Sequence, residues 1–261
     1  MEEKMIIIYI LVAILGLCVG SFLNVVIYRI PNNMNLAYPA SHCPKCQEKI
    51  KWYDNIPVLS YIFLGGKCRH CKEKITVRYL LVEVLNALLW LLSAYVFWKE
   101  SAVYSIVIML VSSVLICITF IDIEHLIIFD CFQIMLLILA IIAIFFDKRV
   151  NFDSKLIGFI FGTLFFMIMH VGAKVVLKKD GLGGGDVKLA AICGLLLGFG
   201  RGFVAIIIAS VMGSVVLLIV NRIRKDKKNQ EYPFAPFIVL GVMISLYIGQ
   251  YICEWYLDLF I

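Results

Sequence analysis

The sequence predicts an all-α polytopic membrane protein with about eight transmembrane helices and one large polar loop after the first helix. The first observation is composition: 62% of the 261 residues are hydrophobic and 16% are charged, with a mean hydropathy of +0.97, whereas soluble domains are about 45–50% apolar and about 25% charged. The second is charge balance, because 18 acidic against 24 basic residues exclude disorder driven by net charge. The third is length, since at roughly 20 residues per span the chain accommodates eight spans and a loop.

Eight apolar runs, almost free of charge, define the predicted helices. The second run is interrupted by Glu83, and the sixth is the shortest. Pairs of glycines four residues apart occur in the first, fifth and sixth runs, and such small residues let helices approach closely in lipid. The eight runs are Met5–Tyr28, Tyr79–Trp98, Ser101–Ile121, Ile127–Phe146, Leu156–Ala173, Val187–Gly200, Gly202–Val220 and Phe234–Cys253.

The distribution of basic residues orients the predicted helices. Eight spans place the loops 29–78, 122–130, 174–188 and 221–233 on one side of the membrane, and three of these four loops hold 18 of the 24 Lys and Arg residues. The positive-inside rule makes that side cytoplasmic and puts both termini outside. The first run is too long for a signal-peptide core and is followed by no small-residue cleavage site. We therefore expect three parts: a first transmembrane helix at 1–28, a cytoplasmic loop at 29–78 and a seven-helix transmembrane domain at 79–261.

Four of the nine cysteines form two C-x-x-C pairs in the predicted cytoplasmic loop. This spacing is typical of a zinc ribbon, in which each pair supplies two thiolates from one tight turn. Disulfides seldom persist in the cytoplasm and the surrounding bases favour thiolates, so zinc is a better explanation than free thiols or a redox pair. Four thiolates leave no open coordination position, which predicts a structural metal. The predicted ligands are Cys43, Cys46, Cys68 and Cys71.

Two aspartates stand at the predicted cytoplasmic ends of apolar runs. Asp122 follows the third run, and Asp186 precedes the sixth, directly after Gly183, Gly184 and Gly185. Ionisable groups at this depth are costly and are candidates for a functional site. Two converging carboxylates that share a proton can act as base and acid on one water. The glycines would allow an extended peptide to lie against Asp186.

Structural roles for these acids are about equally compatible with the spacing. Asp186 could be a carboxylate favoured by the dipole of a helix N-terminus, and Asp122 could be an interfacial residue that reaches water. Other hydrolase chemistries are poorly supported, because the sequence has no G-x-S-x-G, no H-E-x-x-H and no P-loop. Three further acids flank the pair in the sequence: Glu124, Asp130 and Asp180.

Besides the two cysteine pairs, four motifs stand out in the sequence: GSFLNVVIYRIP at 20–31, DNIPVLSY at 54–61, RYLLVE at 78–83 and GGGDVKL at 183–189. Together these motifs resemble those of the bacterial type IV prepilin peptidases, a family of bifunctional membrane enzymes. The resemblance runs nearly from end to end. Two positions depart from the family pattern, since Phe129 stands in place of a proline and Ala235 in place of a glycine; the first departure keeps Asp130 as a rival to Asp122. The GGGDVKL motif is shared in outline with presenilin-type proteases.

The resemblance implies an aspartyl endopeptidase of the bacterial cytoplasmic membrane whose dyad is Asp122 and Asp186. It implies cleavage of the basic leader of prepilins or pseudopilins after a glycine, on the cytoplasmic face, and then N-methylation of the new N-terminal residue with S-adenosylmethionine. The sequence contains no fingerprint for that methyl donor, so this half rests on the resemblance alone. Glu83 and Asn24, polar within apolar runs, could line a substrate groove or the methyl-transfer site, or could make interhelical hydrogen bonds. We expect prepilins and lipid as partners, and no nucleic acid.

Two other functions stay open from the residues alone. An ion-coupled transporter would use the carboxylates as a relay, but it would be expected to show an inverted repeat and acids near mid-bilayer. A membrane-tethered zinc-ribbon scaffold would need the cysteines and could dispense with the aspartates.

Overall fold

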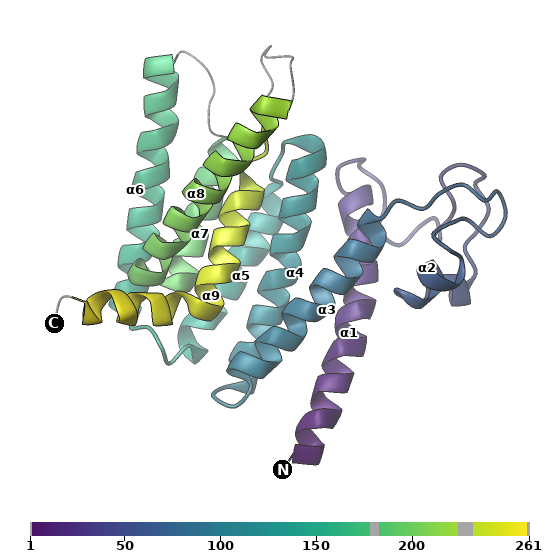
Figure 1. Ribbon diagram of the computed structural model, residues 1–261, viewed down its shortest axis with the longest axis horizontal. Helices are drawn as coiled ribbons and strands as arrows, with labels where there is room; N and C mark the ends of the chain where they lie inside the picture. The colour runs from purple at the N-terminus through teal and green to yellow at the C-terminus, as the bar shows by residue number, and fades with distance from the viewer. Residues whose placement is uncertain (1, 178–182, 224–231, 260–261) are drawn as a thin grey trace. The chain divides into compact units, whose positions relative to one another are not determined.

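The computed structural model describes residues 2–177, 183–223 and 232–259 (Figure 1). Within these ranges all regular secondary structure is helical, apart from two isolated β-bridges in the cysteine loop. The all-helical class predicted from hydropathy is therefore confirmed. The helices of 14 residues or more are α1 (Glu2–Arg29), α3 (Arg78–Phe97), α4 (Ala102–His125), α5 (Asp130–Phe146), α6 (Phe152–Leu177), α7 (Gly184–Leu197), α8 (Phe199–Ile223) and α9 (Ala235–Asp258).

The lengths of these helices separate six that are long enough to cross a membrane from two that are shorter. Among the described residues, α1, α3, α4, α6, α8 and α9 are long and apolar enough to cross a membrane. At 1.5 Å per residue, α5 (17 residues) and α7 (14 residues) rise only about 26 and 21 Å, against a hydrocarbon core of about 30 Å. The predicted sixth run stops early because Gly198, at φ +79°, ends α7, and α8 then begins at Phe199. The eight apolar helices are present, and the number that crosses the whole bilayer stays a prediction.

The chain divides into two compact units, residues 1–117 and 118–261. The first holds α1, the cysteine loop with η1 (Trp52–Asn55) and α2 (Leu59–Phe63), α3 and most of α4. The second holds the last two turns of α4 and all of α5 to α9. The paired aspartates thus belong to the second unit and the four cysteines to the first.

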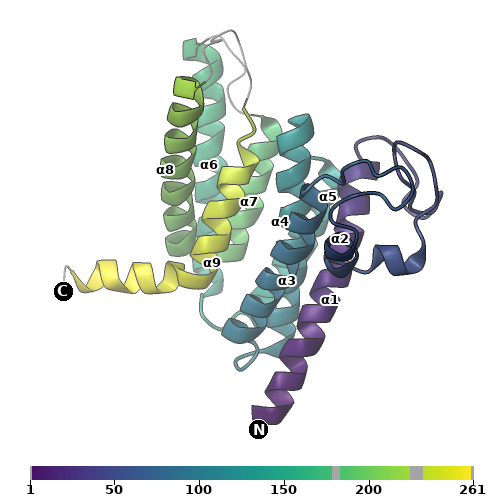
Figure 2. The ribbon, with the colours of Figure 1, turned by 45° about the vertical axis from the view of Figure 1, so that its right-hand side comes forward.

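In the first unit α1 packs along α3 (Figures 1 and 2). The predicted glycine pair of α1 makes this close approach possible, because a Cβ on Gly20 would lie 2.7 Å from the Cα of Glu83. A buried polar network reinforces the contact: Asn86 Nδ2 donates to the carbonyl of Gly16 at 2.7 Å, and Ser113 Oγ on α4 donates to Asn86 Oδ1 at 2.7 Å. Small residues and paired polar groups hold helices together where lipid offers no hydrophobic driving force.

In the second unit α7 is the central helix. It contacts α5, α6, α8 and α9, and ten of its 14 residues are buried. The expected glycine contact lies between α6 and α7, since a Cβ on Gly158 would sit 2.5 Å from the carbonyl oxygen of Gly194. A short helix that is enclosed on all sides holds its N-terminal residues in a fixed place, and Asp186 is one of them.

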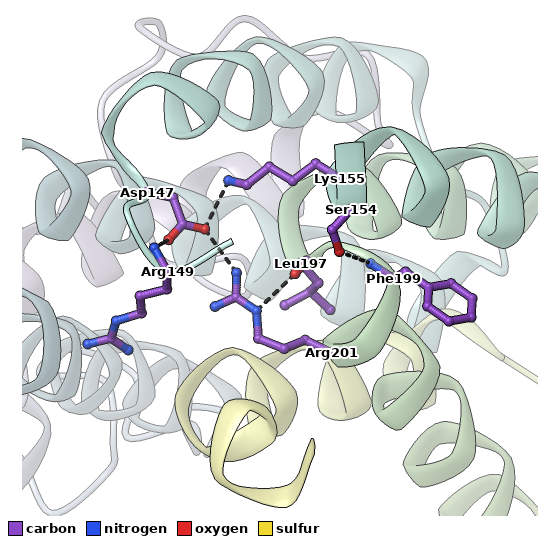
Figure 3. Close-up of polar contacts among 7 residues, drawn as sticks. All are labelled: Asp147, Arg149, Ser154, Lys155, Leu197, Phe199 and Arg201. Carbon is purple, nitrogen blue, oxygen red and sulfur yellow. Dashed lines mark hydrogen bonds and ion pairs between the residues drawn. The ribbon is translucent and has the colours of Figure 1, made fainter. Parts of the chain in front are cut away.

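A buried ion cluster joins the end of α5 to the starts of α6 and α8 (Figure 3). Oδ2 of Asp147 lies 2.9 Å from both Lys155 Nζ and Arg201 Nη2. Lys155 is fully buried and Arg201 is 2% exposed. Arg201 Nε also donates to the carbonyl of Leu197 at 2.9 Å, and Ser245 Oγ on α9 donates to the carbonyl of Arg201. The cluster therefore anchors the C-terminal end of α7 to its neighbours.

Candidate active site and cysteine cluster

Asp122 lies in the last turn of α4 and is 5% exposed. The backbone N–H of Ala235, the first residue of α9, donates to Oδ2 of Asp122 at 3.1 Å, and a second backbone hydrogen bond comes from Phe234. The first N–H groups of a helix have no partner inside the helix, and the helix dipole favours an anion at that end. The start of α9 therefore orients the Asp122 carboxylate.

Asp186 is the third residue of α7 and is 8% exposed. The N–H of Gly183 donates to Oδ2 of Asp186 at 3.1 Å, so the carboxylate folds back over the start of its own helix. Gly185 packs tightly, because a Cβ there would lie 3.1 Å from the Cβ of Ile128, whereas a Cβ on Gly184 would meet nothing within 4 Å. Within the glycine run, Gly185 thus packs closely against Ile128, whereas the backbone at Gly184 has free space beside it.

The two aspartates lie near enough for the charge of one to act on the other. They are 64 positions apart in the sequence, yet the charge of Asp122 acts repulsively on Asp186. Both carboxylates are buried, and each is held through one oxygen by a backbone N–H at the start of a helix. Two like charges in a buried site cannot both ionise without cost, so this arrangement favours one ionised and one protonated carboxyl group.

The neighbouring acids have different surroundings. Asp130 begins α5 and forms an exposed ion pair with Lys188, its Oδ1 lying 2.8 Å from Nζ, with side chains 69% and 60% exposed. Glu124 is exposed in the last turn of α4. Asp180 lies outside the described residues. Burial thus distinguishes Asp122 from its rival Asp130.

The four cysteines of the loop form one cluster. Their sulfur atoms all lie within 4.8 Å of one another, and Cys43 Sγ is 3.8 Å from Cys71 Sγ. A tetrahedral metal with bonds of about 2.3 Å to sulfur requires sulfur atoms about 3.8 Å apart. The cluster therefore fits a tetrahedral metal ion.

The two cysteine turns have the same backbone geometry. In each turn the N–H of the first cysteine bonds to the carbonyl five residues on, Cys43 to Glu48 and Cys68 to Glu73. Backbone N–H groups of Cys71 and His70 hydrogen-bond to the sulfur of Cys68 and lower the pKa of Cys68 to about 7. Such donors favour the thiolate, which is the form that binds metal.

An ion pair connects the second cysteine turn to η1. Arg69 donates from Nε to Asp54 Oδ2 at 2.8 Å and from Nη2 to Oδ1 at 2.5 Å. These hydrogen bonds hold the pKa of Asp54 below its ordinary value. The two-pronged contact fixes geometry more than a single hydrogen bond does, so the aromatic segment between the cysteine pairs is tied to the metal-binding turns.

Sequence reasoning missed several groups that shape the aspartate site. The side chain of Gln133 on α5 donates to the carbonyl of Gly185 at 3.2 Å and thereby ties α5 to the glycine run. The backbone that orients Asp122 comes from Ala235, in a segment noted only for its likeness to a family motif. Gln133 could have been noticed in the sequence, because a glutamine is unusual within an apolar run. The backbone N–H of Ala235 could not, because nothing in the sequence marks a backbone donor that comes from a distant helix.

Comparison with known proteins adds family evidence. The family described as Bacterial Peptidase A24 N-terminal domain matches residues 14–97, which include the four cysteines. The Type IV leader peptidase family matches residues 109–218, which include Asp122 and Asp186. No match was found among the solved structures.

Curated relatives match over nearly the whole chain. A prepilin leader peptidase/N-methyltransferase of Pseudomonas aeruginosa is 34% identical over 269 residues, covering 94% of this chain and 92% of the relative. A type 4 prepilin-like proteins leader peptide-processing enzyme of Escherichia coli O78:H11 is 35% identical over 252 residues, covering 89% and 91%. A prepilin leader peptidase/N-methyltransferase of Aeromonas hydrophila is 31% identical, covering 96% and 94%. This chain therefore belongs to the type IV leader peptidase family.

Proposed function

We propose that this protein is a membrane aspartyl endopeptidase that removes the basic leader of type IV prepilins or pseudopilins and then N-methylates the new terminal residue. The observation that carries the proposal is the pair Asp122 and Asp186: both are buried, the charge of Asp122 acts on Asp186, and each carboxylate is oriented by a backbone N–H. Their location within the residues that match the leader peptidase family supports the same assignment. No observation favours the ion-coupled transporter considered from the sequence.

In the proposed cleavage, one carboxylate of the dyad accepts a proton from a water molecule while the water oxygen attacks the scissile carbonyl carbon. The other carboxyl, protonated at that moment, donates a hydrogen bond to the carbonyl oxygen and stabilises the developing negative charge. The tetrahedral intermediate then collapses, the C–N bond breaks, and the dyad returns a proton to the leaving nitrogen. The backbone bonds from Ala235 and Gly183 keep the two carboxyl groups from turning away during these steps.

The glycine run and the exposed acids are proposed to receive the substrate. The open side of Gly184 gives an extended peptide backbone room to approach Asp186. Glu124 and Asp130 supply negative charge for the basic leader, and Gly183 and Gly185 shape the backbone beside the dyad.

The cysteine cluster is proposed to hold a structural zinc ion, with Cys43, Cys46, Cys68 and Cys71 as the four ligands. Bound zinc would cross-link the two turns of the loop and would leave no position for substrate. The methyl group in the second reaction is proposed to come from S-adenosylmethionine.

The apolar helices and the family place the protein in the bacterial inner membrane as a multi-pass protein. We propose that the basic loop 29–78 lies in the cytoplasm, that both termini lie outside, and that the dyad faces the cytoplasm. The seven-helix region 79–261 is the proposed peptidase domain, and the aspartate pair lies in its 118–261 part.

Purified protein in lipid nanodiscs, incubated with a full-length prepilin and S-adenosylmethionine, tests the proposed function. Mass spectrometry of the products should show a basic leader that ends at glycine and a mature pilin heavier by one methyl group at its terminal nitrogen. A substrate whose leader glycine is replaced by valine is the control and should remain intact. An intact native prepilin after prolonged incubation would contradict the proposal.

A further inference from the structure

The first unit contains a cavity between the C-terminal half of α1 and the start of the cysteine loop. Its volume is about 400 Å³. One wall is a single face of α1, formed by Cys18, Phe22, Val25 and Arg29, and the opposite wall consists of residues from the loop segment 36–41. Cys18 and Arg29 are three helical turns apart, or roughly 16 Å. The cavity therefore reaches from the end of the candidate span Met5–Arg29 well into that span.

Arg29 places a buried positive charge at one end of this cavity. The residue is 6% exposed, and its Nη1 donates to the carbonyls of Asn35 at 2.8 Å and Leu36 at 3.0 Å, while Nη2 donates to the carbonyl of Pro39 at 2.5 Å. All three acceptors are neutral, and among the described residues no Asp or Glu forms an ion pair with this guanidinium. A guanidinium has five N–H donors, and a buried charge is costly unless an opposite charge reaches it. Arg29 can therefore receive an anion from the cavity.

The part of the cavity farthest from Arg29 suits a hydrocarbon chain. Cys18 and Phe22 are exposed and lie within the candidate span, so in a membrane their side chains face the hydrocarbon core. Val25, one turn nearer to Arg29, continues the same apolar surface. A ligand that fits this lining carries an anionic group at one end and an apolar chain at the other.

The cysteine loop folds back beside α1 instead of extending away from its end. In both views α2 lies level with the C-terminal half of α1 (Figures 1 and 2). The N–H of Val58, directly before α2, donates to Oε2 of Glu83 on α3 at 2.8 Å and holds this part of the loop in place. Three apolar side chains of α2 are exposed, namely those of Leu59, Ile62 and Phe63. Exposed apolar groups beside a membrane span indicate contact with the bilayer, so the loop and the cavity that it covers lie against lipid.

The net charge of the loop favours an anionic lipid. Segment 29–78 contains nine Lys and Arg residues but only three Asp and Glu residues. Basic clusters directly beside a membrane span attract anionic head groups. The same positive charge repels the ammonium group of a zwitterionic lipid.

We infer that this cavity binds one anionic phospholipid, with the phosphodiester of its head group paired with Arg29 and one acyl chain lying along Cys18, Phe22 and Val25. Arginine suits this partner, because its planar fork of N–H groups matches the oxygens of a phosphate. The inference does not depend on the proposed function. It makes a membrane lipid a component of the first unit, held where the cysteine loop joins α1.

Native mass spectrometry of the full-length, zinc-loaded protein measures this binding directly. The protein is delipidated in detergent and titrated with phosphatidylglycerol or with phosphatidylcholine that carries the same acyl chains. We expect one phosphatidylglycerol to bind about tenfold more tightly than phosphatidylcholine, and equal affinities would overturn the inference. Excess inorganic phosphate should leave the lipid bound, since it has no chain to occupy the apolar end. Displacement of the lipid by inorganic phosphate would identify free phosphate as the ligand and would also overturn the inference.

Substitutions at the two ends of the cavity test its two halves. Arg29→Gln removes the charge and should weaken phosphatidylglycerol binding about ten- to a hundredfold. Cys18→Trp leaves Arg29 in place but fills the apolar end, and it should weaken binding as well. Lys51→Gln is the matched control, because it removes one exposed base from the same loop, and its affinity should stay within about twofold of that of the unchanged protein. Zinc content and the gel-filtration profile check that the variants are folded. Unaltered binding in either Arg29→Gln or Cys18→Trp would overturn the inference.

Photolabelling of the unchanged protein provides a test that needs no variant. Phosphatidylglycerol with a photoreactive diazirine in one acyl chain is added to the delipidated protein at one equivalent and irradiated. Label concentrated in peptides from residues 18–41 supports the inference. Label spread evenly over the apolar helices, or confined to residues 118–261, overturns it.

Discussion

The ion cluster at Asp147 permits a prediction whose size follows from the structure. Asp147→Asn preserves the shape of the side chain but leaves Lys155 and Arg201, 0% and 2% exposed, without a counter-charge. Removing one member of a buried ion pair typically costs about 3–5 kcal/mol. For a chain of about this size, each kcal/mol lowers the melting temperature by about 2–4 °C, so the variant should melt about 6–20 °C lower. Thermal unfolding in detergent, followed by intrinsic fluorescence, measures the shift.

The exposed ion pair of the same unit supplies the matched control. Asp130→Asn removes the partner of Lys188, but both side chains are mostly exposed, and surface pairs contribute only about 0–1 kcal/mol. Its melting temperature should fall by less than about 4 °C. If Asp147→Asn melted as close to the unchanged protein as this control does, the argument that the cluster anchors α7 would be refuted.

Two further predictions concern packing and the cysteine loop. Gly194→Val should lower the melting temperature measurably, because its Cβ would collide with the carbonyl of Gly158. Gly172→Ala is the control and should have no such effect, because a Cβ on Gly172 meets nothing within 4 Å. Equal melting temperatures for the two variants would contradict the described packing of α6 on α7. Cys43→Ser combined with Cys46→Ser should abolish zinc binding, measured by atomic emission, because it removes two of the four clustered sulfur ligands. A variant that still binds zinc as the unchanged protein does would contradict the assigned ligands.

Much of the fold was predictable because each long helix coincides with a continuous apolar run in the sequence. Uncharged apolar runs predicted the eight long helices. Glycines at four-residue spacing predicted close helix packing in general, and the structure shows one such contact between α6 and α7. The end of α7 at Leu197 was not predicted, since the apolar run continues through Gly198 and only the positive φ of that glycine breaks the helix. The ion cluster was missed because Asp147, Lys155 and Arg201 looked like ordinary charges at the ends of runs.

The candidate site was predictable to the level of residue identity but not of geometry. Two acids in an apolar chain and two cysteine pairs are rare enough to be recognised without a structure. The hydrogen bond from the start of α9 to Asp122, the contact of Gln133 with the glycine run, and the hydrogen bond of Val58 with Glu83 all depend on how distant segments pack. Contacts between segments that are far apart in the chain cannot be predicted from the local sequence of either segment.

The most direct test of the central claim is the rate of leader cleavage in Asp122→Asn and Asp186→Asn, each measured in nanodiscs under single-turnover conditions. Asparagine retains the size of the side chain but can neither accept the proton of water nor deliver one. Because general acid–base catalysis contributes about 10²- to 10⁴-fold, each variant should cleave at least about a hundredfold more slowly. Asp153→Asn, an exposed acid in the first turn of α6, should cleave at the unchanged rate. Near-normal cleavage by either dyad variant would contradict the account.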